Sequence, residues 1–135
     1  MGVETEVEGF LREGEVCIEV ESNKEGILIG KHGRTLDSLQ FLINRMINKE
    51  LKEPMRMSLD INNYKKRRAE SLKQMAIRFG ENAKRTSKEI TIGPFNAHDR
   101  RIIHITLREN PSLKTESLGE GEMKRIKIIP TKKEG

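Results

Sequence analysis

The sequence contains little of what stabilises exported proteins or anchors membrane proteins. Its one cysteine, Cys17, excludes a disulfide within the chain and fits a reducing compartment. No apolar run is long enough to cross a bilayer. No signal peptide is visible, because Met1 is followed by a glutamate-rich segment. We therefore predict a cytoplasmic protein.

Residue groups that perform catalysis are also missing. The three histidines, His32, His98 and His104, are not joined by a cysteine or carboxylate cluster, which argues against a metal site. No glycine-flanked nucleophile is present. Two residues separate the glycines of the Gly30 turn, whereas a phosphate-binding P-loop requires four. We predict no enzyme activity, no cofactor, no metal and no small-molecule substrate.

Aromatic residues are scarce and charged residues are plentiful. The 135 residues are 4% aromatic and 35% charged, with no tryptophan and a net charge of +5. Residues 1–29 carry eight acids and two bases, whereas residues 62–88 carry nine bases and two acids. A basic segment of this kind favours a polyanionic partner. The length allows one domain or two small ones.

The first half of the chain alternates between the periods of strands and helices. Strand patterns occupy residues 3–11 and 16–20, with a turn at 12–15 between them. A short helical turn at 27–29 precedes a glycine turn, and apolar residues then recur at helical spacing from 35 to 51. Residues 55–61 alternate again. We predict the order β-β-α-glycine turn-α-β, with one face of the 35–51 helix buried, namely Leu36, Leu39, Leu42, Ile43, Met46 and Ile47.

The second half reads as α-β-α-β-β. A helix spans 64–86 after a joint and cap at Asn62-Asn63. A strand at 89–92 is broken by Gly93-Pro94, Asn96 caps a helix that runs to 108, and strands occupy 113–118 and 123–129. We predict an α+β protein with two modules, residues 1–62 and 63–130, and a loose tail at 131–135.

The glycine turn is the first candidate binding site. Gly30 and Gly33 allow close approach to a ligand, and Lys31, His32 and Arg34 place charge there. The N-terminal amides of the following helix suit a phosphate. Base selection would fall to an adjacent apolar groove lined by some of Ile27, Leu28, Ile29 and Leu39. The alternative is a tight helix–helix connection with incidental charges.

These residues resemble a type II KH domain over residues 15–62. The resemblance implies that the turn clamps single-stranded nucleic acid. The type II fold usually begins with a helix, which has no counterpart in residues 1–14. We expect an exposed strand edge near residues 3–11 that can pair with another chain.

Arg100 and His104 are the second candidate site. They lie four residues apart, so both project from one helix face, flanked by Arg101 and Arg108. A guanidinium and an imidazole suit phosphate binding and base stacking. The stretch resembles the Arg-x-x-x-His motif of the R-three-H domain over residues 63–130, a module associated with single-stranded nucleic acid. The alternative is an amphipathic helix whose Arg and His are merely solvated.

A basic run on the 64–86 helix has two interpretations. Charged runs on helices are often only solvated faces. Alternatively, the run continues a phosphate track from the glycine turn to the Arg100 face. Its residues are Lys65, Lys66, Arg67 and Arg68.

A KH domain followed directly by an R-three-H domain resembles the Jag family, also called SpoIIIJ-associated proteins or KhpB/EloR. The resemblance implies a bacterial RNA-binding regulator linked to the cell envelope, elongation or division, with a small KH-only protein, or a second copy, as partner. It also implies an indirect link to a membrane insertase. Single-stranded DNA as ligand, or a scaffold protein with incidental nucleic-acid affinity, are the alternatives. Members usually carry a further N-terminal domain and a linker.

Overall fold

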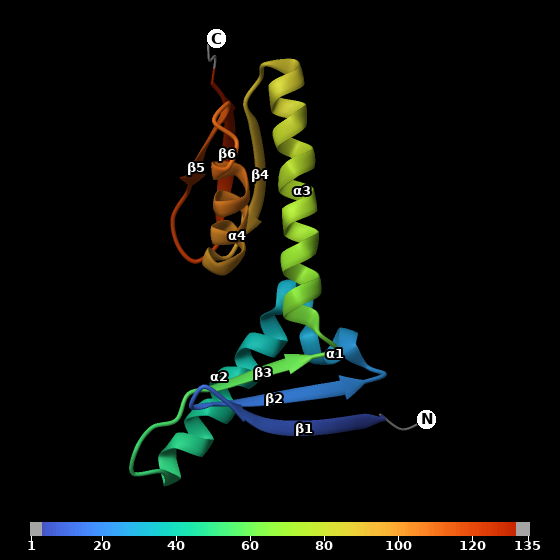
Figure 1. The fold of residues 1–135 in the computed structure, drawn as a ribbon, viewed down its shortest axis with the longest axis vertical. Coiled ribbons are helices and arrows are strands. Elements are labelled where there is room, and N and C mark those ends of the chain that lie inside the picture. The colour runs from blue at the N-terminus through green and yellow to red at the C-terminus, as the bar shows by residue number, and fades with distance from the viewer. Residues whose placement is uncertain (1–3, 132–135) are drawn as a thin grey trace. The chain divides into compact units, whose positions relative to one another are not determined.

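Residues 4–131 are described by the computed structural model of the chain (Figure 1). Helices and strands alternate in it, and they divide into two compact units, residues 1–67 and 68–135. The boundary between the units falls inside one long helix. No helix in the described part of the chain is both long and apolar enough to span a membrane.

The first unit is a three-stranded sheet with helices between its second and third strands. Its elements are β1 (Thr5–Arg12), β2 (Glu15–Ser22), α1 (Glu25–Ile29), a 3₁₀ turn (Lys31–Gly33), α2 (Arg34–Glu50) and β3 (Met57–Ile61). The strand order is β1-β2-β3; β1 pairs antiparallel and β3 parallel with β2. A parallel pair needs a crossover connection, and α1 and α2 supply it. The predicted element order is confirmed.

The core of the first unit lies between the helices and one face of β2 and β3. Val16, Ile18 and Val20 alternate along β2 and pack onto a buried cluster. That cluster contains Ile29, Leu36, Met57, Leu59 and Ile61. β1 contributes nothing to it, and nearly every residue of β1 is exposed. The pair β2–β3 therefore forms the packed part of the sheet.

The apolar stripe of α2 is wider than the surface that covers it. Leu36 is 1% exposed and Leu39, Ile43 and Ile47 pack against the core, as the periodicity predicts. Leu42 and Met46, which the same pattern places on the buried face, are 55% and 70% exposed, so that part of the prediction is wrong. The sheet of this unit meets only the flank of α2 that faces β2 and β3.

The joint between β3 and the next helix differs from the predicted cap. Asn62 and Asn63 adopt left-handed φ angles of 49° and 55°, which an N-cap residue does not. The Asn62 side chain instead bonds the backbone of Ser22, while the Asp60 carboxylate accepts the N–H of Lys65 at 3.2 Å. Asp60 thus takes the capping role that the sequence assigned to the asparagines.

The second unit packs two helices on a three-stranded antiparallel sheet. Its elements are α3 (Tyr64–Thr86), whose first turn belongs to the first unit, β4 (Ile90–Phe95), α4 (Ala97–Arg108), β5 (Leu113–Leu118) and β6 (Lys124–Pro130). The strand order is β4-β6-β5. Its core joins both helices to the sheet through Leu72, Ala76, Ala83, Ile92, Phe95, Ile103, Leu107, Leu113, Ile126 and Ile128.

Two details of the second unit correct the sequence prediction. β4 continues through Gly93-Pro94, where the sequence predicts that the strand breaks. Its register against β6 shifts between Ile92 and Phe95, so these two residues form a bulge within the strand. Thr131 is held by its backbone N–H, which donates to the carbonyl of Ser112 at 2.8 Å, so it is not part of a loose tail. Residues 132–135 and the predicted strand residue Val3 lie outside the described residues.

Candidate nucleic-acid interface

The glycine turn has a backbone that only glycine adopts easily. Gly30 has φ 73° and ψ −178°, Gly33 has φ 78°, and His32 between them has φ 56°. A Cβ at Gly30 would collide with the Thr35 side chain, and a Cβ at Gly33 would lie 2.9 Å from Cε2 of Tyr64. Both glycines are therefore required by internal packing as well as by the turn itself.

The side chains of the turn face solvent above this packed base. Lys31, His32 and Arg34 are exposed, while Gly33 is buried. The N-cap of α2 is Gly33, and it provides no side-chain hydrogen bond to the first amides of the helix. Cationic side chains thus gather beside a helix N-terminus, an arrangement that favours an anionic group.

The residues predicted to line an apolar groove beside the turn differ in their exposure. Ile29 is 6% exposed and packs in the core of the first unit, so its side chain supports the turn from within and cannot face a ligand. Leu28 and Leu39 also pack against that core. Leu28 and Leu39 remain half-buried, and Ile27, 72% exposed, is the most accessible of the four to a base.

The basic run at the start of α3 does not form one free face. Lys65 donates from Nζ to the Gln40 side chain at 2.7 Å. Arg67 pairs with Glu25 at 2.9 Å. Arg68 belongs to the second unit and pairs with Asp99 at 3.0 Å, where the two side chains are 23% and 5% exposed. Lys66 is exposed. Three of these four side chains are thus engaged in contacts within their own units, and the phosphate track stays a prediction.

The Glu25 carboxylate is stabilised in its charged form by this arrangement. Asn62 donates a side-chain hydrogen bond to Glu25 at 3.0 Å, and Arg67 adds its positive charge. These two interactions, the hydrogen bond first, hold the pKa of Glu25 below its usual range. Arg67 therefore forms its ion pair with a residue of α1, within the first unit.

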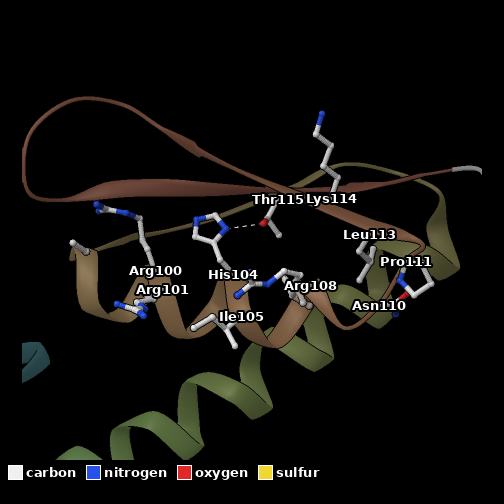
Figure 2. Close-up of a pocket in the computed structure, with 12 residues that line it drawn as sticks. Arg100, Arg101, His104, Ile105, Arg108, Asn110, Pro111, Leu113, Lys114 and Thr115 are labelled. Atoms are coloured by element: carbon white, nitrogen blue, oxygen red, sulfur yellow. Dashed lines mark hydrogen bonds between the residues drawn. The ribbon is translucent and has the colours of Figure 1, made fainter.

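A groove of about 620 Å³ runs along α4 in the second unit. Figure 2 shows His104 directed from α4 towards Thr115 on β5. Cationic and apolar side chains share the lining of this surface, which we call the α4 groove. The lining is Ala97, Arg100, Arg101, His104, Ile105, Leu107, Arg108, Asn110, Pro111, Leu113, Lys114 and Thr115.

His104 is tied to β5 through both ring nitrogens. Nδ1 lies 2.6 Å from Oγ1 of Thr115, and Nε2 lies 3.0 Å from Oγ of Ser117. Partial burial, and secondarily the charge of Arg100, lower the pKa of His104 from its ordinary value of 6.5. A neutral imidazole at neutral pH can donate through one nitrogen and accept through the other, and the two hydroxyls can match either tautomer.

Arg100 is also engaged within the fold. Its Nη1 donates to the backbone carbonyl of Phe95 at 2.6 Å and to that of Glu122 at 3.0 Å. The guanidinium therefore joins the start of α4 to the end of β4 and to the β5–β6 connection. Arg100 and His104 thus form part of the lining of the α4 groove and differ from the merely solvated pair of the alternative interpretation, while their contact with nucleic acid stays a prediction.

The exposed cations of the α4 groove are the side chains best placed for a ligand. Arg101 and Arg108 are exposed on α4, and Lys114 is exposed on β5. Ile105, 43% exposed, adds an apolar surface on which a base can stack. The sequence motif did not identify Lys114 or Thr115, because their approach to α4 depends on how β5 pairs with β6. Asn96 caps α4 as predicted, accepting the Asp99 N–H at 2.8 Å.

The part of the chain that the structure describes contains no cluster of three or more His, Cys, Asp or Glu side chains suited to a metal ion. Both candidate surfaces instead present cations on a rigid frame. Phosphates and bases are the chemistry that such surfaces can bind.

Known protein families match both units. The KhpA/KhpB KH domain matches residues 1–61, and the R-three-H domain matches residues 70–130. The chain is 38% identical over 134 residues to the RNA-binding protein KhpB of Clostridium symbiosum, covering 99% of this chain and 60% of that protein. It is 35% identical over 111 residues to the RNA-binding protein KhpB of Bacillus subtilis, covering 81% of this chain and 53% of the relative. The chain thus spans only part of the curated relatives that it matches.

Proposed function

The chain belongs to the KhpB (Jag) family, in which a KH domain precedes an R-three-H domain, and from that membership we propose that it binds single-stranded RNA. The glycine turn holds the backbone of one short segment, and the α4 groove holds another. Phosphate contacts position the strand at both places, and exposed apolar side chains select among bases. The proposed role is binding without catalysis.

The observation that carries this proposal is the exposed glycine turn on its packed base. Gly30 and Gly33 are held against Thr35 and Tyr64, so Lys31 projects from a backbone that is held in place by packing. A preorganised surface loses less conformational entropy when a ligand binds. RNA and single-stranded DNA both offer the required phosphates, and RNA is favoured by the names of the relatives.

The test is a fluorescence-anisotropy titration with short single-stranded RNA, single-stranded DNA and duplex competitors. Lys31→Glu should weaken RNA binding about tenfold or more, because it places a carboxylate beside a phosphate, whereas Lys52→Glu, an equal change at an exposed site beyond α2, should change it little. Arg101→Ala with Lys114→Ala tests the α4 groove without touching Arg100 or His104. If Lys31→Glu and Lys52→Glu weaken RNA binding equally, the binding is only nonspecific charge attraction.

A second candidate function is protein docking, and the exposed apolar side chains of α2 favour it. Phe41, Leu42 and Met46 are 60%, 55% and 70% exposed on the same helix. We propose that a small KH-only protein binds these side chains in the cytoplasm. Through this contact the chain would take part in the control of cell elongation or division, near a membrane insertase. Met46→Lys should abolish binding to such a protein in a pull-down while RNA affinity is kept. If Met46→Lys leaves protein binding intact, α2 is not the docking surface.

A further inference from the structure

The sheet of the first unit has two edges, and among the described residues side chains bond the outer backbone of one of them, β3. On the β3 edge the N–H of Leu59 donates to Oε1 of Gln40 on α2 at 3.0 Å. The N–H of Ile61 donates to its neighbour Asp60 at 2.9 Å. Two of the backbone donors that would recruit another strand to β3 are therefore already in use.

The opposite edge, β1, directs every second residue outward. The N–H of Val16 donates to Arg56, and the carbonyl of Val20 accepts from Asn62, so both valines turn their backbone groups towards β3. Their partners across the β1–β2 ladder are Leu11 and Val7. Because an antiparallel ladder alternates between bonded and non-bonded pairs, Leu11 and Val7 turn their N–H and C=O groups away from the sheet.

The full outward set follows from the same alternation. The eight pairs between β1 and β2 are consecutive without a bulge, so the phase set by Val7 and Leu11 holds along the strand. A hydrogen bond next to the strand agrees with this phase. The Asn23 N–H donates to the Glu4 carbonyl at 3.2 Å, so Glu4, like the other even-numbered residues, turns its backbone towards β2. The outward residues are Thr5, Val7, Gly9 and Leu11.

The two faces beside this edge have different chemistry. Val7 and Leu11 are 67% and 70% exposed on the face that carries the core in β2 and β3. On the opposite face Glu6 and Glu8 lie directly across from Glu21 and Glu19. An added strand would therefore lie next to apolar side chains on one face and next to carboxylates on the other.

We propose that β1 accepts an extended segment of a partner protein in which Lys or Arg alternates with apolar residues, so that the segment becomes a fourth strand of the sheet. Its backbone pairs with Val7 and its neighbours, its apolar side chains cover Val7 and Leu11, and its cations lie beside Glu6 and Glu8. This is strand addition at an open sheet edge.

A second copy of the chain is a poor occupant of the same edge. Pairing β1 with another β1 would bring Glu6 and Glu8 of both copies onto one face, and like charges opposite one another destabilise a sheet. A cationic segment turns the same carboxylates into attractive neighbours. The edge lies apart in sequence from the glycine turn and does not depend on whether that turn binds RNA.

The probe is an eight-residue peptide that alternates Lys and Val, added to the ¹⁵N-labelled full chain. Hydrogen exchange followed by NMR should show that the amides of Thr5, Val7, Gly9 and Leu11 exchange at least tenfold more slowly with the peptide than without it. The inward amides of Glu6 and Glu8 should already be protected in the free protein. The same peptide with an N-methyl group on every residue keeps its charge but has no backbone N–H left to donate on either edge, and it should give no protection.

Two variants test the backbone and charge contributions separately. Val7→Pro removes an outward N–H without removing a β1–β2 ladder bond and should lower affinity at least tenfold, whereas Val7→Thr should bind nearly as well as the natural chain. The double variant Glu6→Lys with Glu8→Lys should no longer bind the Lys-Val peptide and should bind a Glu-Val peptide instead. This variant tests the edge even if Val7→Pro fails to fold.

Three outcomes would overturn the proposal. Equal binding of the N-methylated peptide would leave only charge attraction. Peptide binding without protection of the outward amides would place the peptide elsewhere. Protection of these amides in the free protein, growing with protein concentration and matched by dimerisation in sedimentation, would assign the edge to a second copy of the chain.

Discussion

Gly30 combines two demands that usually occur separately in a turn. Its φ and ψ lie in a region that is essentially restricted to glycine, and the Thr35 side chain occupies the space where a Cβ would be. The first demand is conformational and the second is steric. A side chain at this position would therefore disturb both the turn and the first residues of α2.

Gly30→Ala should destabilise the first unit by about 1–3 kcal/mol, the range for a residue forced into such a conformation. It should also weaken RNA binding, because the turn must shift. The measurement is urea unfolding followed through NMR signals of the first unit. Gly26→Ala is the matched control, because Gly26 lies in α1 with open space around its Cβ position. Equal stability of the two variants would contradict this account.

His104 should make the stability of the second unit depend on pH. Its pKa is lowered in the folded protein from 6.5, chiefly by burial, so the unfolded chain binds a proton more readily. Stability should be complete above about pH 6.5 and should fall as the pH drops towards the folded pKa.

The His104 prediction is checked by thermal unfolding at several pH values between about 7.5 and 5, with the ring protons of His104 titrated by NMR. His104→Gln should be less stable at pH 7.5, since it cannot reproduce the contacts with Thr115 and Ser117, and should lose part of the pH dependence. An unchanged slope would show that the histidine does not contribute.

The sequence predicts which helix face carries the motif residues, but it does not predict which side chains contact them. The spacing of Arg100 and His104 placed both on one helix face, because helical periodicity is local. The partners of His104 lie 11 and 13 residues further along the chain, and only the register of β5 brings them to it. In the same way, Ile27 and Ile29 are both apolar, and the short α1 decides which of them is buried.

At the scale of elements, the Arg68–Asp99 ion pair joins α3 to α4. Asp99 is 4% exposed and also lies in the first turn of α4, where a carboxylate is favoured by the helix dipole. A buried ion pair adds little over an apolar pair of the same shape, but removing one partner strands the other. This contact therefore fixes how the two helices pack.

Asp99→Asn should destabilise the second unit by about 3 kcal/mol, because it replaces the carboxylate that pairs with the partly buried Arg68 guanidinium by a neutral amide. Glu89→Ala breaks the exposed pair between Glu89 and Lys127 and should change stability by less than about 0.5 kcal/mol. Chemical unfolding of both variants checks the comparison. A small effect at Asp99 would mean that solvent reaches the pair readily.

Element boundaries were predictable where the cause is local. The Asn96 cap and the end of α4 at residue 108 depend on neighbouring residues, and the predicted helix agrees with Ala97–Arg108. The passage of β4 through Gly93-Pro94 was not predictable, because the bulge exists only in the pairing with β6. The exposed flank of α2 was missed because periodicity shows which residues are apolar and not what covers them.

For the whole molecule, the distribution of charge matters more than the net value of +5. The acids of residues 1–29 include Glu6, Glu8, Glu19 and Glu21, which share one face of the first sheet. Exposed cations are present both at the glycine turn and in the α4 groove. Nucleic acid should therefore be repelled from one face and attracted to two others.

The salt dependence of RNA binding should report how many phosphate contacts the two units make. For single-stranded RNA, the slope of log affinity against log salt should fall by about 0.7 for each phosphate contact that is lost. Lys31→Ala and Lys114→Ala should each lower the slope by roughly that amount, and together by about twice as much, if one strand engages both units. Titrations at a series of salt concentrations provide the measurement. A double variant with the slope of either single one would indicate that only one unit is occupied.

Tyr64, packed against Gly33, also gives the protein an intrinsic optical probe. The chain contains one tyrosine and no tryptophan, so its tyrosine emission originates from a single ring. That ring lies beside the backbone of the glycine turn. Occupancy or distortion of the turn can therefore be followed by quenching or recovery of tyrosine emission in the unlabelled protein, without a dye or an added reporter residue.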